Sequence, residues 1–215
     1  MREKIIENIL KEKLIVIVRG VESEKLIPLA EAMYDGGIRL LEITYGSDDT
    51  KTANSIKMLR EHFGEKMHIG AGTVTTPVRA VLTKNAGGEF IISPNTEPET
   101  IKMTRSLGMV SIPGALTPSE IVTANNAGAD FVKLFPISNL GAQYLKAVKA
   151  PLSNVRFLAV GGINEENIGE YYAAGACGFG IGSNIINKAA LKAGDYNVIA
   201  ETARKYVSAV AEACK

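Results

Sequence analysis

The sequence predicts an α/β fold in which parallel strands alternate with helices, and three observations support this prediction. Short apolar runs rich in β-branched residues recur eight times along the 215 residues, and their starts lie about 20 to 30 residues apart, the length of one strand, one helix and two loops. The segments between them carry apolar residues at steps of three and four, as a helix with one buried face requires. Several of these segments end in glycine shortly before the next run, which is typical of a helix C-terminus.

Each predicted strand corresponds to one apolar run. The eight runs are residues 14–18, 38–43, 68–71, 90–93, 110–112, 131–135, 156–160 and 177–181. Helical periodicity is clear over residues 23–34, 50–63, 98–106 and 118–126, and further helices are predicted at residues 4–11 and 196–213. The glycines expected to end helices are Gly36, Gly37, Gly87, Gly88, Gly108, Gly128 and Gly175. Strands that alternate with helices pair in parallel through right-handed crossovers.

Two architectures accommodate eight parallel strands: a closed (β/α)8 TIM barrel and an open doubly wound sheet. The chain lies at the small end of the size range of the barrel. The open sheet is expected to carry a glycine-rich dinucleotide-binding turn after the first strand, but residues 19–22 do not fit that pattern. We therefore expect a (β/α)8 barrel with an extra N-terminal helix. Because no linker or change of composition divides residues 1–215, we expect a single domain.

Composition and charge exclude several classes of protein. The 24 Lys and Arg residues balance 23 Asp and Glu residues, whereas a dedicated nucleic-acid-binding protein is basic overall or carries a dense basic stripe. No apolar run approaches the roughly 20 residues that span a bilayer, and the first residues lack the apolar core of a secretory signal. The two Cys and two His lack the spacing of a zinc site. We expect a cytoplasmic protein that binds a small molecule and needs no metal.

Lys133 is the strongest candidate for a catalytic residue. The reaction chamber of a (β/α)8 barrel lies at the C-terminal ends of its strands, and Lys133 shares one face of its predicted strand with Phe131 and Phe135. If that face points into the barrel, burial disfavours the ammonium and lowers the pKa of Lys133, which makes a nucleophilic amine available for a Schiff base. The alternative is a lysine that extends to the rim or pairs with a carboxylate.

Two further charged residues interrupt apolar strands. Glu42 shares a face with Leu40 and Thr44, and a carboxylate inside a barrel needs a partner or a chemical task. It could move protons during imine chemistry, or form a plain ion pair with Lys133 or Arg19. Arg19 closes the first strand, and its forked guanidinium suits a substrate carboxylate, with a salt bridge at the rim as the alternative.

Glycine-rich turns follow the last two predicted strands, at Gly161-Gly162 and at residues 180–183. Glycines let backbone N–H groups approach an anion, and a following helix N-terminus adds favourable charge. Barrels often bind phosphate at these two positions, so the two turns together predict a phosphate site. At the other strand ends glycine and proline shape the turns, and Thr73 offers the one obvious hydroxyl.

Six motifs in order and in register resemble the 2-keto-3-deoxy-6-phosphogluconate (KDPG) and 4-hydroxy-2-oxoglutarate (KHG) aldolases. They cover essentially the whole chain, which makes them much more specific together than any one alone. The motifs are Leu41-Glu42-Ile43-Thr44, Gly70-Ala71-Gly72-Thr73-Val74, Ile92-Ser93-Pro94, Ile112-Pro113-Gly114, Val132-Lys133-Leu134-Phe135-Pro136 and Gly161-Gly162-Ile163.

The resemblance implies a metal-independent class I aldolase barrel, usually a homotrimer, that cleaves its sugar acid to pyruvate and glyceraldehyde 3-phosphate. By position it implies that Lys133 forms the imine, without another cofactor, and that Glu42 is the general acid/base. The remaining implied contacts are Arg19, Thr73 and Pro94 around the pyruvate moiety, Phe135 against the imine, and Gly161, Gly162 and Ser183 at the phosphate.

Two positions depart from the pattern of the phosphogluconate aldolases. Some members carry Arg in the turn after the Leu-Glu-Ile-Thr strand, where this chain has Tyr45-Gly46-Ser47, so one possible anion contact is missing. Val160 precedes Gly161-Gly162 in place of Thr, which resembles the 6-phosphogalactonate aldolases. The two substrates differ in configuration at C4, and Val removes a hydrogen bond that Thr could make. Residues 94–95 and 141–144 resemble the galactonate branch too, and the choice between substrates stays open.

Two more distant functions use the same residues. In a phosphosugar isomerase or epimerase, Glu42 would act as a simple base and Lys133 only as a charge. A non-catalytic phosphosugar-binding barrel would keep the phosphate turns and tolerate Lys133→Arg.

Overall fold

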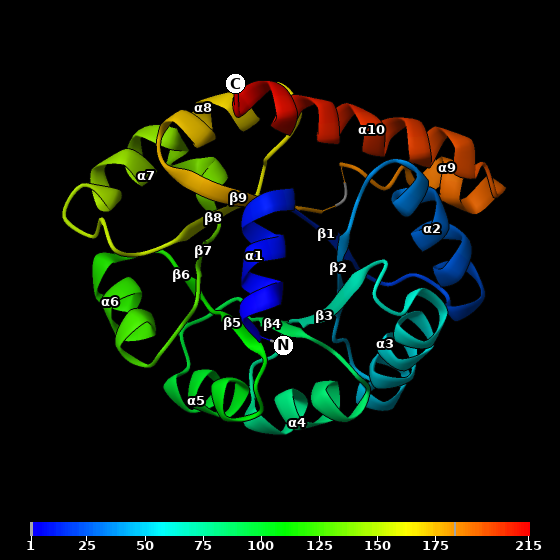
Figure 1. The fold of residues 1–215 in the computed structure, drawn as a ribbon, viewed down its shortest axis with the longest axis horizontal. Helices are drawn as coiled ribbons and strands as arrows, with labels where there is room; N and C mark the ends of the chain where they lie inside the picture. The colour runs from blue at the N-terminus through cyan, green and yellow to red at the C-terminus, as the bar shows by residue number, and fades with distance from the viewer. Residues whose placement is uncertain (1, 183) are drawn as a thin grey trace.

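Helices and parallel strands alternate around a central barrel in the computed structural model, which describes residues 2–182 and 184–215 (Figure 1). The strands are β1 (Leu14–Val18), β2 (Leu40–Thr44), β3 (His68–Gly72), β4 (Phe90–Ile92), β5 (Val110–Ile112), β6 (Gly114–Ala115), β7 (Val132–Leu134), β8 (Phe157–Val160) and β9 (Ala176–Ile181). They pair in parallel in the order β5-β4-β3-β2-β1-β9-β8-β7-β6. Because β5 and β6 at the two ends of this order are separated in the chain by Pro113 alone, the sheet returns on itself. The predicted barrel is confirmed.

Pro113 explains why the structure has nine strands where eight runs predict eight. The fifth predicted strand coincides with β5, which pairs with β4, and the additional strand β6, which pairs with β7, follows directly after Pro113. Proline has no N–H and interrupts a ladder of backbone hydrogen bonds, so the two strands are separate. The carbonyl of Pro113 still accepts a hydrogen bond from the Lys133 N–H at 2.8 Å, which ties this segment to β7. Six of the eight predicted strands differ from the observed ones by one or two residues at an end; for example, β2 begins at Leu40 and β7 spans only Val132–Leu134.

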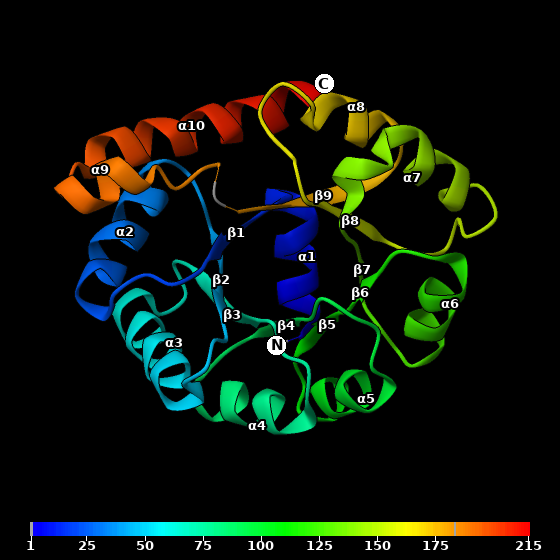
Figure 2. The same ribbon diagram turned by 180° about the vertical axis from the view of Figure 1, so that it is seen from behind.

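Most helices form a ring outside the barrel, whereas α1 (Arg2–Glu12) lies across its centre, as Figures 1 and 2 show from the two ends. The others are α2 (Ser23–Asp35), α3 (Asp49–Phe63), α4 (Pro77–Asn85), α5 (Pro98–Ser106), α6 (Pro118–Asn126), the short 3₁₀ helix η1 (Ile137–Asn139), α7 (Gly141–Lys149), α8 (Ile168–Ala173), α9 (Lys188–Ala193) and α10 (Tyr196–Ala213). No helix among the described residues combines the length and apolarity needed to cross a membrane.

Local sequence determines where several helices begin and end. Both α4 and α6 start with a proline at the first helical position, and the preceding Thr76 and Thr117 accept a backbone N–H of the first turn. Proline is favoured there because its missing N–H would have no partner in the helix. Gly108 and Gly128 follow α5 and α6 with φ of +75° and +100°, a conformation in which a Cβ is strained.

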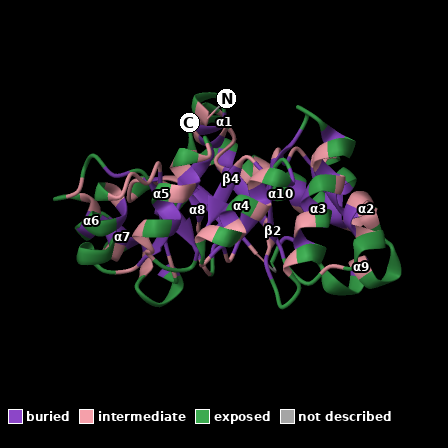
Figure 3. Ribbon diagram, turned by 90° about the horizontal axis from the view of Figure 1, so that it is seen from below, coloured by how far each residue is buried: buried purple, intermediate pink, exposed green. Residues whose placement is uncertain are grey.

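The apolar core has two layers, and the inner one is closed at one end by α1. The outer layer lies between strands and helices. In the inner layer Ile5, Ile6 and Ile9 of α1 pack with residues that point into the barrel. Asn8 Nδ2 lies 2.7 Å from Nε2 of His68, the first residue of β3, so α1 covers the N-terminal ends of the strands, at one end of the barrel in Figure 3. Access to the interior is therefore left to the opposite end.

We predict that Gly70→Ala destabilises the protein, because a Cβ at Gly70 would lie 2.3 Å from the Phe90 ring inside the barrel. Overpacking of this kind costs about 1–3 kcal/mol of the free energy of unfolding, measurable by urea denaturation. The control is Gly169→Ala in α8, where a Cβ meets nothing within 4 Å and better helix propensity should add about 0.5–1 kcal/mol. Unchanged stability of the Gly70→Ala protein would contradict the packing.

Candidate active site

Lys133 and Glu42 lie inside the barrel. Lys133, in the middle of β7, is 7% exposed, and Glu42, in the middle of β2, is 2% exposed. Phe131 and Leu40, two residues before them on the same strand faces, belong to the inner apolar layer. The Lys133 Nζ lies 4.5 Å from the centroid of the Phe135 ring, a cation–π contact. Lys133 therefore points inward and does not extend to the rim, which decides between the two possibilities that the sequence left open.

The Glu42 carboxylate is only partly hydrogen-bonded. Its Oε1 accepts a hydrogen bond from Thr44 Oγ1 at 3.3 Å, and its Oε2 has no partner among the described residues. A close ion pair with Lys133 or Arg19 is thus not formed. A Cβ at Gly72 of the neighbouring strand would lie 1.5 Å from Oε1, so only glycine leaves room for the carboxylate. A buried acceptor without a donor is costly, and Glu42 Oε2 is such an acceptor.

Burial shifts the pKa values of Lys133 and Glu42 in the directions that favour the neutral amine and the neutral carboxyl group. Desolvation raises the pKa of Glu42, although the charge of Lys133, the Thr44 hydrogen bond and the charge of Arg19 oppose this shift. Desolvation lowers the pKa of Lys133, the charge of Arg19 lowers it further, and Glu42 opposes both. A neutral amine is a nucleophile and a protonated carboxyl group is a proton donor, so the pair is suited to covalent acid/base chemistry.

Two adjacent cavities open at the C-terminal ends of the strands, and Arg19 lines both. The larger, about 690 Å³, which we call the mouth cavity, lies between the ends of β1, β7, β8 and β9. The smaller, about 440 Å³, which we call the side cavity, lies between the ends of β1, β2 and β3 and is lined by Thr44 and Thr73. Lys133 and Glu42 line neither cavity and lie deeper, but Phe135, which contacts the Lys133 ammonium, lines the mouth cavity.

The glycine turn after β8 lines the mouth cavity. Gly161 and Gly162 both have positive φ, +102° and +71°, and a Cβ at Gly162 would lie 2.6 Å from that of Ser138. The next helix, α8, begins only at Ile168, so the turn itself faces the cavity and the helix N-terminus does not adjoin it. Gly180 and Gly182 line the same cavity, whereas Ser183 lies outside the described residues.

Of the two remaining predicted contacts, Thr73 lines one of the two cavities and Pro94 lines neither. Thr73 is half-buried beside the side cavity, and its φ is +58°. A β-branched residue in this left-handed region is strained by about 1–3 kcal/mol and persists only where its surroundings hold it. Pro94 is exposed at the end of β4 and lines neither cavity.

Sequence patterns missed two polar residues of the mouth cavity. Asn184 and Lys188 line it together with Arg19, and Lys188 begins α9, a helix that was not predicted. The sequence feature that could have identified these two residues is their position shortly after the last glycine turn. In the described part of the chain, no three His, Cys, Asp or Glu side chains gather closely enough to hold a metal ion.

The pH dependence of Lys133 reactivity tests this site. Acetic anhydride acylates the neutral amine, so the rate should rise with pH through a midpoint below 10.5, because burial lowers the pKa. In Glu42→Gln the midpoint should move lower still, since the carboxylate that favours the ammonium is gone. Peptide mass spectrometry of Lys133 measures both. A midpoint at or above 10.5, or an upward shift in the variant, would contradict the assignment.

Comparisons with known proteins identify the family. A family model described as KDPG and KHG aldolase matches residues 5–202. The 2-dehydro-3-deoxy-6-phosphogalactonate aldolase of Escherichia coli is 37% identical over 81% of this chain and 85% of its own. A structure described as native KDPGal superposes with a TM-score of 0.86 at 34% identity, covering 94% of this chain and 95% of that one.

A third relative bears on the chemistry. The KDPG aldolase of Legionella pneumophila, with pyruvate captured as a covalent carbinolamine intermediate, superposes with a TM-score of 0.82 at 31% identity, covering 90% of this chain and 93% of that one. The resemblance inferred from the six motifs is confirmed. The chain belongs to the KDPG and KHG aldolase family, and the protein is an aldolase, a carbon–carbon lyase.

Proposed function

We propose that this aldolase forms a Schiff base on Lys133 and cleaves a 2-keto-3-deoxy-6-phospho sugar acid to pyruvate and glyceraldehyde 3-phosphate. The observation that carries the proposal is the buried Lys133 amine, with its pKa lowered, in the same barrel interior as the buried Glu42 carboxylate. The covalent carbinolamine in the Legionella relative supports it. Membership of an aldolase family does not support the isomerase, epimerase or non-catalytic alternatives.

The first half of the reaction builds the imine. The lone pair of neutral Lys133 Nζ attacks the C2 carbonyl carbon and gives a carbinolamine. Glu42, whose protonated form is favoured by burial because burial raises its pKa, donates its proton to the carbinolamine hydroxyl, which leaves as water. The product is a protonated imine between Lys133 and C2, and the Phe135 ring packs against its positive charge.

The second half breaks the C3–C4 bond. The Glu42 carboxylate takes the proton of the C4 hydroxyl, C4 becomes the aldehyde carbon, and the electrons of the C3–C4 bond move to C3 as the protonated imine becomes a neutral enamine. After the aldehyde leaves, Glu42 returns its proton to C3. Water then hydrolyses the imine, which releases pyruvate and regenerates the Lys133 amine.

The two ends of the substrate bind on opposite sides of the site. We assign Arg19, Thr73 and Pro94 to the pyruvate end, of which Arg19 and Thr73 line the side cavity. Backbone N–H groups of Gly161 and Gly162 hold the phosphate, and Arg19 and Lys188 give the mouth cavity positive charge that suits an anion. Ser183 is assigned to the phosphate by family resemblance alone. Anchoring both ends places C2 and C4 against the reacting groups, which lowers the entropic part of the barrier.

Val160 favours the galactonate epimer as substrate. Its side chain is buried at the edge of the mouth cavity and packs against Gly180, so no hydroxyl is present where Thr would offer one to the C4 region. The relatedness to a 6-phosphogalactonate aldolase of Escherichia coli agrees with this choice. 2-Keto-3-deoxy-6-phosphogluconate and 4-hydroxy-2-oxoglutarate are the second candidates, because the family model and the Legionella relative include aldolases for them. The proposed route needs no added cofactor, and the homotrimer and the cytoplasmic location stay predictions.

Borohydride trapping tests the imine. Incubation with pyruvate and sodium borohydride should give a stable adduct, located on Lys133 by intact mass and peptide mapping. Lys133→Ala and the charge-preserving Lys133→Arg should give none, since neither has a nucleophilic amine. Glu42→Gln should lower kcat by about 10²–10⁴-fold, the contribution typical of a general acid/base. Trapping on another lysine, or none under conditions that label a known class I aldolase, would overturn the mechanism.

The C4 epimers test the substrate assignment. We expect a higher kcat/KM for 2-keto-3-deoxy-6-phosphogalactonate than for its C4 epimer, 2-keto-3-deoxy-6-phosphogluconate. Val160→Thr, which is nearly isosteric, should move the ratio toward the gluconate epimer by about two- to tenfold, the value of one hydrogen bond. If wild type and variant handle the two epimers alike, Val160 does not select the substrate.

A further inference from the structure

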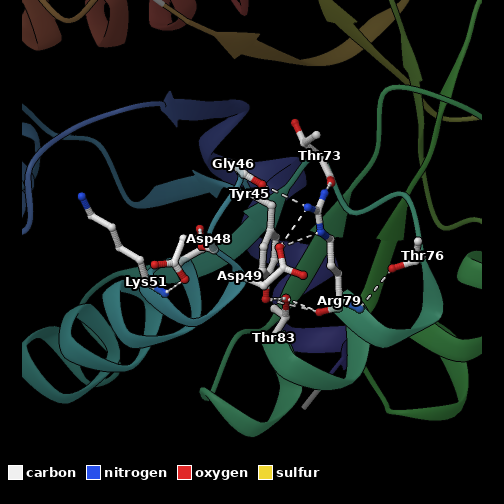
Figure 4. A network of polar contacts seen from close by, with 10 residues as sticks. Tyr45, Gly46, Asp48, Asp49, Lys51, Thr73, Thr76, Arg79 and Thr83 are labelled. Atoms are coloured by element: carbon white, nitrogen blue, oxygen red, sulfur yellow. Dashed lines mark hydrogen bonds and ion pairs between the residues drawn. The ribbon is translucent and has the colours of Figure 1, made fainter.

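Arg79 joins the ends of the two strands that lead to the side cavity. It lies in the first turn of α4, and its guanidinium uses all three nitrogens (Figure 4). NH1 donates to the Thr73 carbonyl at 3.0 Å, which follows β3, and NH2 donates to the Gly46 carbonyl at 3.0 Å, which follows β2. Nε donates to Asp49 Oδ1 at 3.0 Å, and NH2 lies 2.9 Å from the same oxygen.

Tyr45 fixes the place of this guanidinium. The ring of Tyr45 lies under Arg79 Cζ at 5.1 Å from its centroid, and its hydroxyl lies 3.1 Å from Thr83 Oγ1 in the same helix. The Tyr45 N–H donates to the Gly72 carbonyl at 2.9 Å. Tyr45 is 3% exposed, so aromatic packing and hydrogen bonds from both strands leave the Arg79 side chain a single position.

The group held by Arg79 is the strained backbone of Thr73. Figure 4 shows the Thr73 carbonyl facing the guanidinium while the Thr73 side chain points away from it. With φ at +58°, this orientation is one that Thr does not keep without support. The preceding residue is Gly72, against which Glu42 Oε1 packs. Displacement of this turn would therefore move Thr73 and disturb the space around Glu42.

We propose that Arg79 is a positioning residue for the pyruvate end of the substrate, acting through the Thr73 carbonyl to hold the Thr73 hydroxyl in its binding position. This inference rests on the proposed function, since it takes Thr73 as a contact of the pyruvate moiety. Arg79 itself does not line either cavity. Lysine cannot replace it, because an ammonium lacks the planar fork that serves two carbonyls and a carboxylate at once.

Arg60 offers a matched control at the opposite end of the barrel. Its guanidinium also bonds two backbone carbonyls, those of Gly64 and Met67, and one carboxylate, that of Glu89. The exposed fractions of the two side chains are 21% for Arg60 and 20% for Arg79. Met67 precedes β3, whereas Thr73 follows it. Loss of either arginine should thus cost similar stability, and only loss of Arg79 should disturb substrate binding.

The test measures the pyruvate concentration that gives half-maximal borohydride trapping on Lys133. Arg79→Met should raise it about tenfold, as expected for a displaced binding group, and Arg79→Lys should raise it by a similar factor while keeping the charge. Arg60→Met should leave it within about twofold. Circular dichroism and thermal melting confirm that each variant is folded at the assay temperature, and Arg79→Lys serves if Arg79→Met does not fold.

A double-variant cycle separates positioning from a general loss of structure. In a Thr73→Ala background the hydroxyl is already absent. Arg79→Lys should therefore change the pyruvate concentration for half-maximal trapping by less than about threefold. Equal effects of Arg79→Lys in both backgrounds, a single-variant effect below threefold, or an equal effect of Arg60→Met would each overturn the proposal. If the wild type itself forms no adduct, the Schiff-base function fails. If the wild type is trapped and Arg79 has no effect, only the positioning role fails.

Discussion

Burial of an amine and a carboxylate inside an apolar barrel is the constraint on which the rest of the structure depends. Desolvation lowers the pKa of Lys133 and raises that of Glu42, the directions that the proposed nucleophile and proton donor require. The interior must remain apolar for the effect to persist. Helix α1 contributes to this by closing the N-terminal end of the barrel with Ile5, Ile6 and Ile9. Chemistry is thereby confined to the open end.

The site is kept in a state that folding alone would not favour. Glu42 Oε2 is buried without a hydrogen-bond partner among the described residues, and Thr73 has a backbone conformation that a β-branched side chain resists. Both features lie at the ends of β2 and β3, where Gly72 leaves room for the carboxylate. Natural proteins tolerate such a loss of stability at functional sites, because the rest of the fold is stable enough to hold the strained residues in place.

The two cavities are formed by two sets of strands, to which the proposed function assigns the two ends of the substrate. The ends of β1, β2 and β3 form the side cavity, and the ends of β1, β7, β8 and β9 form the mouth cavity. Arg19 on β1 lines both, which places one guanidinium between the assigned pyruvate and phosphate ends. A barrel makes this arrangement simple, because all parallel strands present their C-terminal ends to one space. Substrate preference can then change through single residues such as Val160 without altering the lysine chemistry.

Sequence by itself predicted the barrel and which residues share a strand face with Lys133 and Glu42, because side chains alternate along a strand; that these faces point into the barrel was decided by the tertiary structure. The sequence determined α5, α6 and α10 to the residue, since proline and cap residues act locally. Only the tertiary structure decided that Gly72 faces Glu42, that Lys188 reaches the mouth cavity and that Arg79 joins two loops. Those contacts depend on how separate strands and helices are placed against one another in space, and spacing along the chain does not encode that placement.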